Sequence, residues 1–167
     1  MVDYTAQRSQ KDEFFKRSRQ SPLDHDVQHG FESLSYFEPD ESLVFTVTPQ
    51  PGDGAELTIE TSDGQQRVYR RAAVARFDVH GEPVTLALYD SGHPGYFLPF
   101  RDATSGKSTY GAGRYLDIEP NSDGTVTIDF NLAYNPFCAY NDAYSCPLPP
   151  VENWLPVAIE AGEKDFG

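Results

Sequence analysis

The chain has 167 residues, which is enough for one hydrophobic core but not comfortably for two, so the sequence predicts a single domain over residues 1–167. Its formal net charge is −13, from 26 acidic and 13 basic residues. A charge of this sign repels phosphate backbones and anionic lipid surfaces, which argues against nucleic acid and membranes as partners.

The first predicted element is a helix over residues 3–19. Glu13 and Arg17 form an acid-first pair at i,i+4 spacing, which stabilises a helix. Pro22 disfavours helical geometry in the residue before it and ends the helix. The polar stretch at 24–30 that follows is predicted to be a loop.

From residue 43 onward, apolar residues alternate with polar ones, as in strands that have one face in water. Clusters of Gly, Pro, Asn and Asp at 49–54 and 121–124 predict turns. Ala72 and Ala73 mark a bend or bulge in the longest run. The predicted strands are 43–48, 55–60, 68–79, 84–88, 95–100, 113–118 and 124–131.

Short strands at this spacing, with no helical period between them, predict antiparallel sheets and no parallel β-α-β units. An aromatic content of 13% fits such sheets, because flat rings pack well on a pleated surface. We therefore expect a mainly β fold: an antiparallel sandwich or a partly closed barrel, with the N-terminal helix packed on one opening.

Residues 133–160 follow no clear period, yet they contain three Tyr, one Phe, one Trp and both Cys. A disordered segment would not carry so many large rings. The prolines in this segment also reduce the entropy that is lost when it becomes ordered. We expect an ordered, Pro/Tyr-rich C-terminal coil over the last strand, which would bring Glu163 or the Asn135 amide near Arg114.

Arg114 has the same strand parity as Leu116 and Ile118, so it faces the core if those two residues do. A guanidinium there needs a carboxylate, because it cannot lose its charge. One interpretation is a structural arginine–carboxylate pair. The other is a clamp for a small anionic or carbonyl ligand, made by the bidentate fork of the arginine.

Asp129 and Asn131 lie on the strand face opposite the apolar residues, which is either a solvent face or part of a polar site. The polar site is suggested by the tyrosines and asparagines that follow, since these side chains form hydrogen-bonded networks when they are buried. The candidate ligand-binding residues are Arg114, Asn131, Tyr134, Asn135 and Glu163, and the candidate catalytic residues are Asp129 and Tyr110.

Cys138 and Cys146 are eight positions apart, and three interpretations stay open: packed thiols, a disulfide worth roughly 2–3 kcal/mol, or a reactive or metal-bound pair. The four histidines show no ligand spacing to them, so no metal site and no cofactor are expected.

Familiar catalytic motifs are missing from the sequence: it contains no nucleophile elbow, phosphate-binding loop or dinucleotide fingerprint. His93 is the best-placed histidine for acid–base chemistry, in a loop just before the strand 95–100. The alternative for this residue is a solvent-exposed turn.

Lysine is scarce, with only Lys11, Lys16, Lys107 and Lys164 among the basic residues. An acidic, lysine-poor surface is typical of proteins in high salt, where ions screen the repulsion, so a halophilic source is a hypothesis. No segment approaches the about 20 apolar residues of a membrane span, and the N-terminus lacks the apolar core of a signal peptide. The expected location is therefore the cytoplasm.

Several short motifs are distinctive enough to compare with known families: KDEFF (11–15), LSYF (34–37), TYGAGRYL (109–116), DFNLAYNP (129–136), CPLPP (146–150) and AGEK (161–164). Together they resemble the DUF1684 family, a prokaryotic family of unknown function. The resemblance spans essentially the whole chain. It implies that the region of Arg114, Asp129, Asn131 and the two cysteines is a common feature of the family, and it supplies no activity.

Three hypotheses of function remain. The first is an enzyme, a hydrolase or lyase, in which Arg114 holds a small anionic or carbonyl compound, Asp129 is the base and Tyr110 a donor. The second is a pocket that binds such a ligand without catalysis. The third is a structural or interaction module whose polar cluster locks the C-terminal coil. An enclosed cavity would favour the first two, and the sequence does not define the oligomeric state.

Overall fold

Two helices precede the β-structure in the computed structural model, which describes residues 2–90, 92 and 94–166. The first helix, α1 (Tyr4–Arg17), confirms the predicted N-terminal helix, and the Asp3 carboxylate caps it by accepting from the Ala6 N–H. The predicted loop at 24–30 is wrong, because it contains the short helix α2 (His25–His29). The segment is so polar that its sequence pattern does not indicate this short helix, which follows Asp24 at its N-cap.

All strand pairs in the described part of the chain are antiparallel, as predicted. The strands are β1 (Val44–Val47), β2 (Gln50–Pro51), β3 (Glu56–Glu60), β4 (Gln66–Val79), β5 (Glu82–Asp90), β6 (Tyr96–Phe100), β7 (Arg114–Ile118) and β8 (Val126–Asp129). Single 3-10 turns occur at Glu41–Leu43 (η1), Phe130–Leu132 (η2), Phe137–Ala139 (η3) and Val151–Asn153 (η4).

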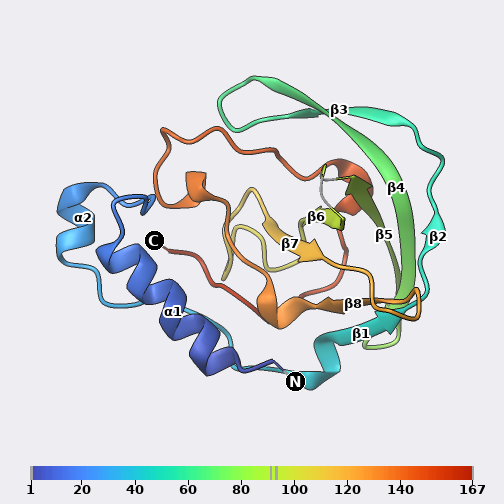
Figure 1. Cartoon of the computed structure of the whole chain (residues 1–167), viewed down its shortest axis with the longest axis horizontal. Helices are drawn as coiled ribbons and strands as arrows, with labels where there is room; N and C mark the ends of the chain where they lie inside the picture. The colour runs from blue at the N-terminus through green and yellow to red at the C-terminus, as the bar shows by residue number, and fades with distance from the viewer. Residues whose placement is uncertain (1, 91, 93, 167) are drawn as a thin grey trace.

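The main sheet has the order β2-β4-β5-β6-β7, with β3 paired to the other end of β4, and β1 and β8 form a separate two-stranded sheet. The sheet curls but does not close, so the partly closed barrel is wrong in that respect (Figure 1). Helix α1 therefore packs on no barrel opening. It lies beside the C-terminal coil instead (Figure 1).

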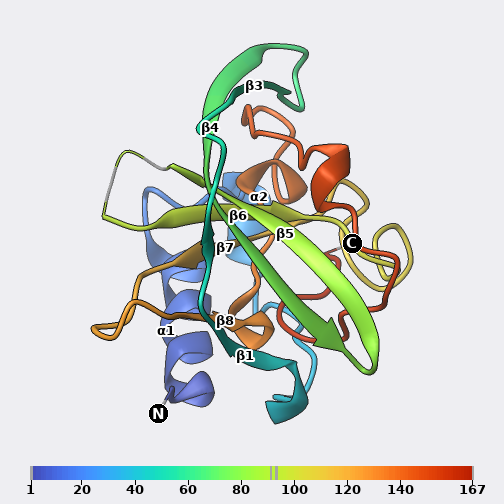
Figure 2. The same ribbon diagram turned by 90° about the vertical axis from the view of Figure 1, so that its right-hand side faces the viewer.

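Strand β4 is long enough to pair with β3 at its start and with β5 along the rest of its length (Figure 2). Its register with β5 shifts between Arg71 and Ala73, which confirms the predicted irregularity. Strand β2 pairs with β4 just after this shift, so the predicted turn at 49–54 is wrong in part.

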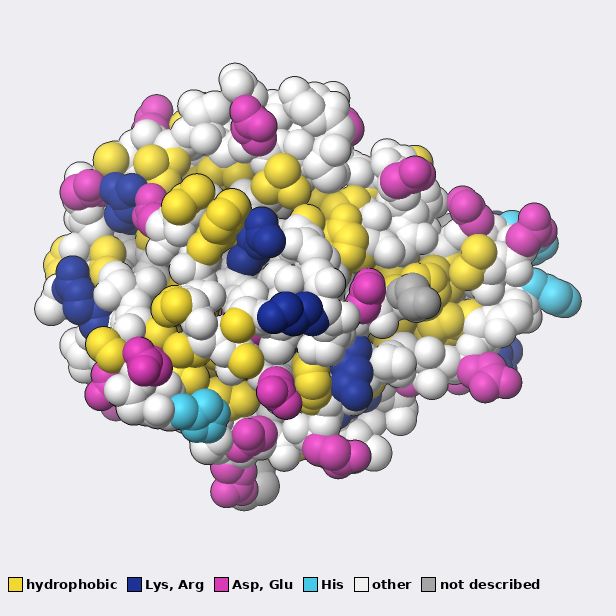
Figure 3. Space-filling view, turned by 180° about the vertical axis from the view of Figure 1, so that it is seen from behind, with side chains coloured by type: hydrophobic (Ala, Val, Ile, Leu, Met, Phe, Trp, Pro, Cys, Tyr) yellow, Lys and Arg dark blue, Asp and Glu magenta, His cyan; other side chains and the backbone are white. Residues whose placement is uncertain are grey.

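The surface of the described residues carries acidic, basic and hydrophobic side chains (Figure 3). Seen from behind, Asp and Glu side chains are spread over the face (Figure 3). None of the described helices is long and apolar enough to cross a membrane. Large apolar side chains are exposed at Val2, Phe14, Val27, Val68, Phe137, Val151 and Trp154.

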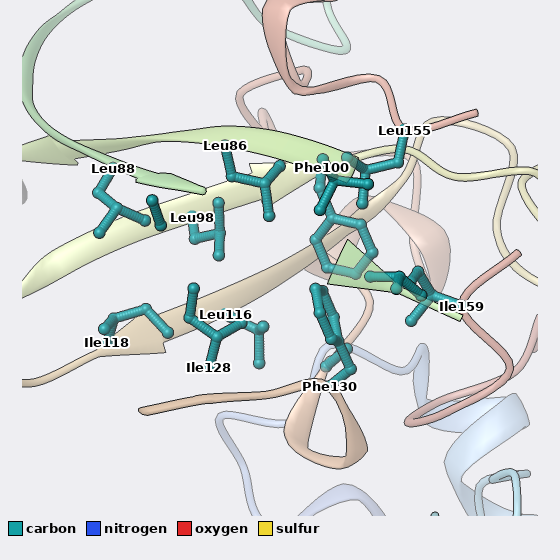
Figure 4. Close-up of a cluster of buried hydrophobic side chains, with 14 of the residues drawn as sticks. Leu86, Leu88, Leu98, Phe100, Leu116, Ile118, Ile128, Phe130, Leu155 and Ile159 are labelled. Atoms are coloured by element: carbon teal, nitrogen blue, oxygen red, sulfur yellow. The ribbon is translucent and has the colours of Figure 1, made fainter. Parts of the chain in front are cut away.

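The main core lies between the curled sheet, the β1–β8 pair and the C-terminal coil (Figure 4). Alternate residues of β5, β6 and β7 supply one side, and Ile128 and Phe130 supply the other. Leu155 and Ile159 reach this core from the coil. Burying one such side chain contributes about 1.5–3 kcal/mol to the free energy of folding. The coil therefore stabilises the fold as part of its core and does not merely cover it.

Candidate functional site

Arg114, at the start of β7, is fully buried at 0% exposure and shares a face with Leu116 and Ile118, as its parity predicted. Its guanidinium donates to three main-chain carbonyls of the coil: Ile159 at 2.9 Å, Glu163 at 3.2 Å, and Ala161. Burial lowers the pKa of Arg114, while nearby Asp102 opposes this effect. A guanidinium remains charged even so.

The carboxylate partner of Arg114 is Asp102, which the sequence reasoning missed. Arg114 Nη2 lies 3.4 Å from Asp102 Oδ1, and both side chains are buried. Asp102 Oδ2 accepts from the Ile159 N–H at 2.6 Å and from the Thr104 hydroxyl at 2.7 Å. The ion pair therefore holds the N–H and the carbonyl of the same coil residue, Ile159.

Asp102 could have been found from strand register. Phe100 pairs with Arg114 in the β6–β7 hairpin, and Asp102 follows two residues later on the same face. Both strands were predicted, but their pairing was not. The carboxylate expected near Arg114 was that of Glu163, and only the main-chain carbonyl of Glu163 contacts the arginine.

The Glu163 carboxylate is buried in a second group of side chains beneath α1. It pairs with the Lys11 ammonium and accepts from the Tyr140 hydroxyl. The Asn135 N–H lies 3.4 Å from Glu163 Oε1. Burial, followed by the charge of Glu163, raises the pKa of Tyr140. The buried carboxylate is thus surrounded by a cation and two hydrogen-bond donors.

Helix α1 contacts these groups with one stripe of side chains at helical spacing: Tyr4, Arg8, Lys11 and Phe15. The Tyr4 hydroxyl donates to Asp129 at 2.5 Å, and burial with this bond raises the pKa of Tyr4 to about 12. Arg8 donates to the Phe37 carbonyl at 2.9 Å. This stripe was not predicted, although the spacing of its residues by 4, 3 and 4 positions in the sequence is typical of one helix face.

Asn131 joins Asp129 to the segment before η1. Its amide donates to the Asp40 carbonyl at 2.9 Å and accepts from the Asp40 N–H at 2.8 Å. It also donates to Asp129 Oδ1 at 3.0 Å. The pair is buried, so the solvent-face interpretation of Asp129 and Asn131 does not apply.

Asn135 and Tyr134 hold other parts of the coil. The Asn135 amide donates to the Lys164 carbonyl at 3.0 Å, while its buried Oδ1 finds no partner among the described residues. The Tyr134 hydroxyl donates to Asp117 at 2.7 Å on the outer side of β7. Burial raises the pKa of Tyr134, and the bond to Asp117 adds to the effect.

Tyr110 lies with the two cysteines and apart from Asp129. Its hydroxyl is 3.6 Å from Cys138 Sγ. The Cys138 N–H donates to Cys146 Sγ at 3.3 Å, and both thiols are free and buried. Among the described residues, no three or more His, Cys, Asp or Glu side chains are grouped to hold a metal ion. His93 lies outside the described residues.

A further buried amide, Asn153 in η4, was also not predicted as a site residue. It accepts from the Ala87 N–H at 2.8 Å and donates to the carbonyls of Ala87 and Pro99, each at 2.9 Å. Strands β5 and β6 pair at Tyr89 and Asp90, and Asn153 joins them farther along, at Ala87 and Pro99.

The predicted site residues thus fall into separate groups, most of whose members are buried. Open grooves of about 710, 440 and 550 Å³ lie elsewhere, and none of them is lined by a predicted site residue. The largest is lined by Tyr36, Phe37, Glu38, Pro39, Asp40, Glu41, Ser42, Glu160 and Lys164.

The fold and this network define an antiparallel β protein whose C-terminal segment is tied to the sheet by buried polar side chains. The chain belongs to the DUF1684 family of proteins of unknown function, whose family model matches residues 29–164. Helix α1 precedes the matched range.

A solved structure agrees with this fold. The solution NMR structure of the uncharacterized protein from gene locus rrnAC0354 of Haloarcula marismortui is 42% identical, with a TM-score of 0.73. The match covers 96% of this chain and 91% of that protein. A comparison with curated proteins gave no match.

Proposed function

We propose that the protein is a non-catalytic structural or interaction module whose buried polar cluster locks the C-terminal coil and helix α1 onto the sheet. The observation that carries this proposal is Arg114. At 0% exposure, it donates to three coil carbonyls and pairs with Asp102, which itself bonds to the coil. Such a guanidinium supports the fold and is not open to a ligand.

A hydrolase or lyase needs its acid and base within reach of one substrate atom. Asp129 instead accepts from Tyr4 and Asn131, while Tyr110 lies against Cys138. A small anionic or carbonyl ligand is also a weaker proposal. The largest groove carries Glu38, Asp40, Glu41 and Glu160 beside Lys164, and four carboxylates repel an anion.

The locking role predicts a local effect at Asn131. Replacing Asn131 by alanine leaves the Asp40 N–H and carbonyl without their partner, which costs about 1–3 kcal/mol. The Asp40 amide should then exchange with deuterium markedly faster, as read by hydrogen-exchange mass spectrometry or NMR. The matched control is Asn121→Ala, because Asn121 is exposed and bonds to the Thr125 and Thr127 hydroxyls. Unchanged exchange at Asp40 in the Asn131 variant would refute the lock at this point.

The competing ligand-site function has its own test. The chain and its Asp129→Asn variant are heated with a panel of small carboxylates, phosphates and aldehydes. The locking proposal expects no compound to raise the melting temperature in a way that depends on Asp129. A compound that stabilises the parent by several degrees and leaves the variant unchanged would favour a binding site.

We also propose that the surface is adapted to high salt in a cytoplasm. The net charge of −13, the four lysines and the similarity to a Haloarcula protein support this. Raising ionic strength from 0.1 M to 1 M shortens the screening length from about 10 Å to about 3 Å, which weakens self-repulsion. Urea unfolding in KCl should therefore give a free energy of unfolding that increases with salt. Equal stability at both salt concentrations would contradict the adaptation.

A further inference from the structure

The structure places two thiols together that the locking role does not use. Cys138 and Cys146 are 9% and 7% exposed, so they lie just beneath the surface. The Cys138 N–H donates to Cys146 Sγ at 3.3 Å, which places the two cysteines next to each other.

Cys146 is positioned by the turn after β3. Its N–H donates to the Ser62 hydroxyl at 3.1 Å, and its carbonyl accepts from the Ser62 N–H at 2.9 Å. Cys138 is positioned by the 3-10 turn η3, which begins after Pro136. These main-chain anchors and the bond from the Cys138 N–H to Cys146 Sγ hold the two cysteines next to each other, as closure of a disulfide requires.

The surroundings of Cys138 favour its thiolate. Hydrogen bonds from the Cys146 thiol, which is the largest cause, and from the Tyr110 hydroxyl lower the pKa of Cys138 to about 6, against the effect of burial. The same bond raises the pKa of Cys146. The other titratable groups near the pair are Arg67 from β4 and Tyr115 from β7, with Asp165 beyond Tyr110.

We propose that Cys138 and Cys146 form a hydroperoxide-reactive dithiol, in which Cys138 is the nucleophile and Cys146 is the resolving thiol. The Cys138 thiolate attacks one oxygen of the hydroperoxide, the O–O bond breaks, and the other oxygen leaves as water or an alcohol after taking a proton. Cys138 is then a sulfenic acid. The Cys146 sulfur attacks Cys138 Sγ, the S–O bond breaks, and the hydroxyl leaves as water with the Cys146 proton.

The hydroperoxide is the sole oxidant in this reaction: the two thiols lose two electrons, and the O–O bond takes them up as it breaks. Burial of both sulfur atoms favours a small oxidant over a bulky disulfide. The hydroxyl of Tyr110, at 3.6 Å from Cys138 Sγ, is placed to donate to the thiolate.

The reaction is tested on the full reduced chain with hydrogen peroxide as the probe. Intact-mass spectrometry should show loss of two hydrogen atoms, reversed by dithiothreitol. The Cys146→Ser variant should stop at the sulfenic acid, which dimedone traps on Cys138. The Cys138→Ser variant should lose thiol about tenfold more slowly or less at pH 7. Equal rates for both variants, or a parent that stays reduced while a free-cysteine peptide oxidises, would overturn the proposal.

The pH dependence gives a second measurement that needs no serine variant to fold. Because a thiolate is the nucleophile, alkylation of the parent by iodoacetamide should rise with a midpoint near pH 6. Cys146→Ala removes the largest cause of the lowered pKa, so its midpoint should move up by more than one pH unit. Tyr110→Phe should move it by less. A parent midpoint near pH 9 would overturn the assignment of Cys138. None of these results depends on the locking role of Arg114.

Discussion

Removing residues 133–167 is expected to unfold the whole chain and not merely to shorten it. The deletion takes Leu155, Ile159 and Ala161 out of the main core. It also removes the three carbonyls that Arg114 binds, so a charged side chain would be left buried without partners. Far-UV circular dichroism and size-exclusion chromatography should show loss of a cooperative melt and an expanded or aggregated chain.

The matched control is a chain that ends at Lys164. It keeps Ile159, Ala161 and Glu163, and loses mainly the Phe166 ring contacts with Phe31 and Tyr140. It should still melt cooperatively at a moderately lower temperature. If the longer deletion instead stays soluble, monomeric and cooperatively folded, then the coil is not part of the folding unit that we infer for residues 1–167.

Arg114→Leu is expected to lower the free energy of unfolding by about 3–5 kcal/mol, the usual loss when one member of a buried ion pair is removed. Leucine fills part of the volume but donates no hydrogen bond. Asp102 is then buried without its cation, and the coil carbonyls lose their donor. Urea unfolding at neutral pH measures the loss, and hydrogen exchange should locate it first at residues 157–163.

Arg70→Leu is the matched control, since it makes the same change in a strand arginine that pairs with Asp90 on the surface. Exposed pairs contribute about 0.2–1 kcal/mol, so this variant should differ little from the parent. Removing both charges, in Arg114→Leu with Asp102→Leu, should recover part of the stability that Arg114→Leu loses. An Arg114→Leu variant that unfolds like the Arg70 variant would show that the arginine does not hold the coil.

The local alternation of apolar and polar residues was sufficient to predict most strands and the face on which Arg114 lies. Apolar alternation identifies which residues share a face, and Leu116 and Ile118 do face the core with Arg114. Pairing between distant strands was not predictable from the sequence alone. Strand β1 pairs with β8 across about half of the chain, and no local signal in either segment encodes the partner.

The predicted site residues lie in separate groups because neighbours in sequence point in different directions. Asp129 and Asn131 were assigned to a face that would be wet in an isolated sheet, and α1 covers that face through Tyr4. Tyr110 turns toward Cys138, and the Glu163 side chain toward Lys11. Burial of a polar residue depends on which distant element covers it, and here a polar helix stripe does so.

The contact between Lys11 and Glu163, which are 152 positions apart, has a consequence for synthesis of the chain. Helix α1 leaves the ribosome before its partners on the coil have been translated. A helix of 14 residues is marginal in water without tertiary contacts. The core strands therefore stay partly uncovered until the coil has been translated, and aggregation or chaperone binding competes with folding during this interval.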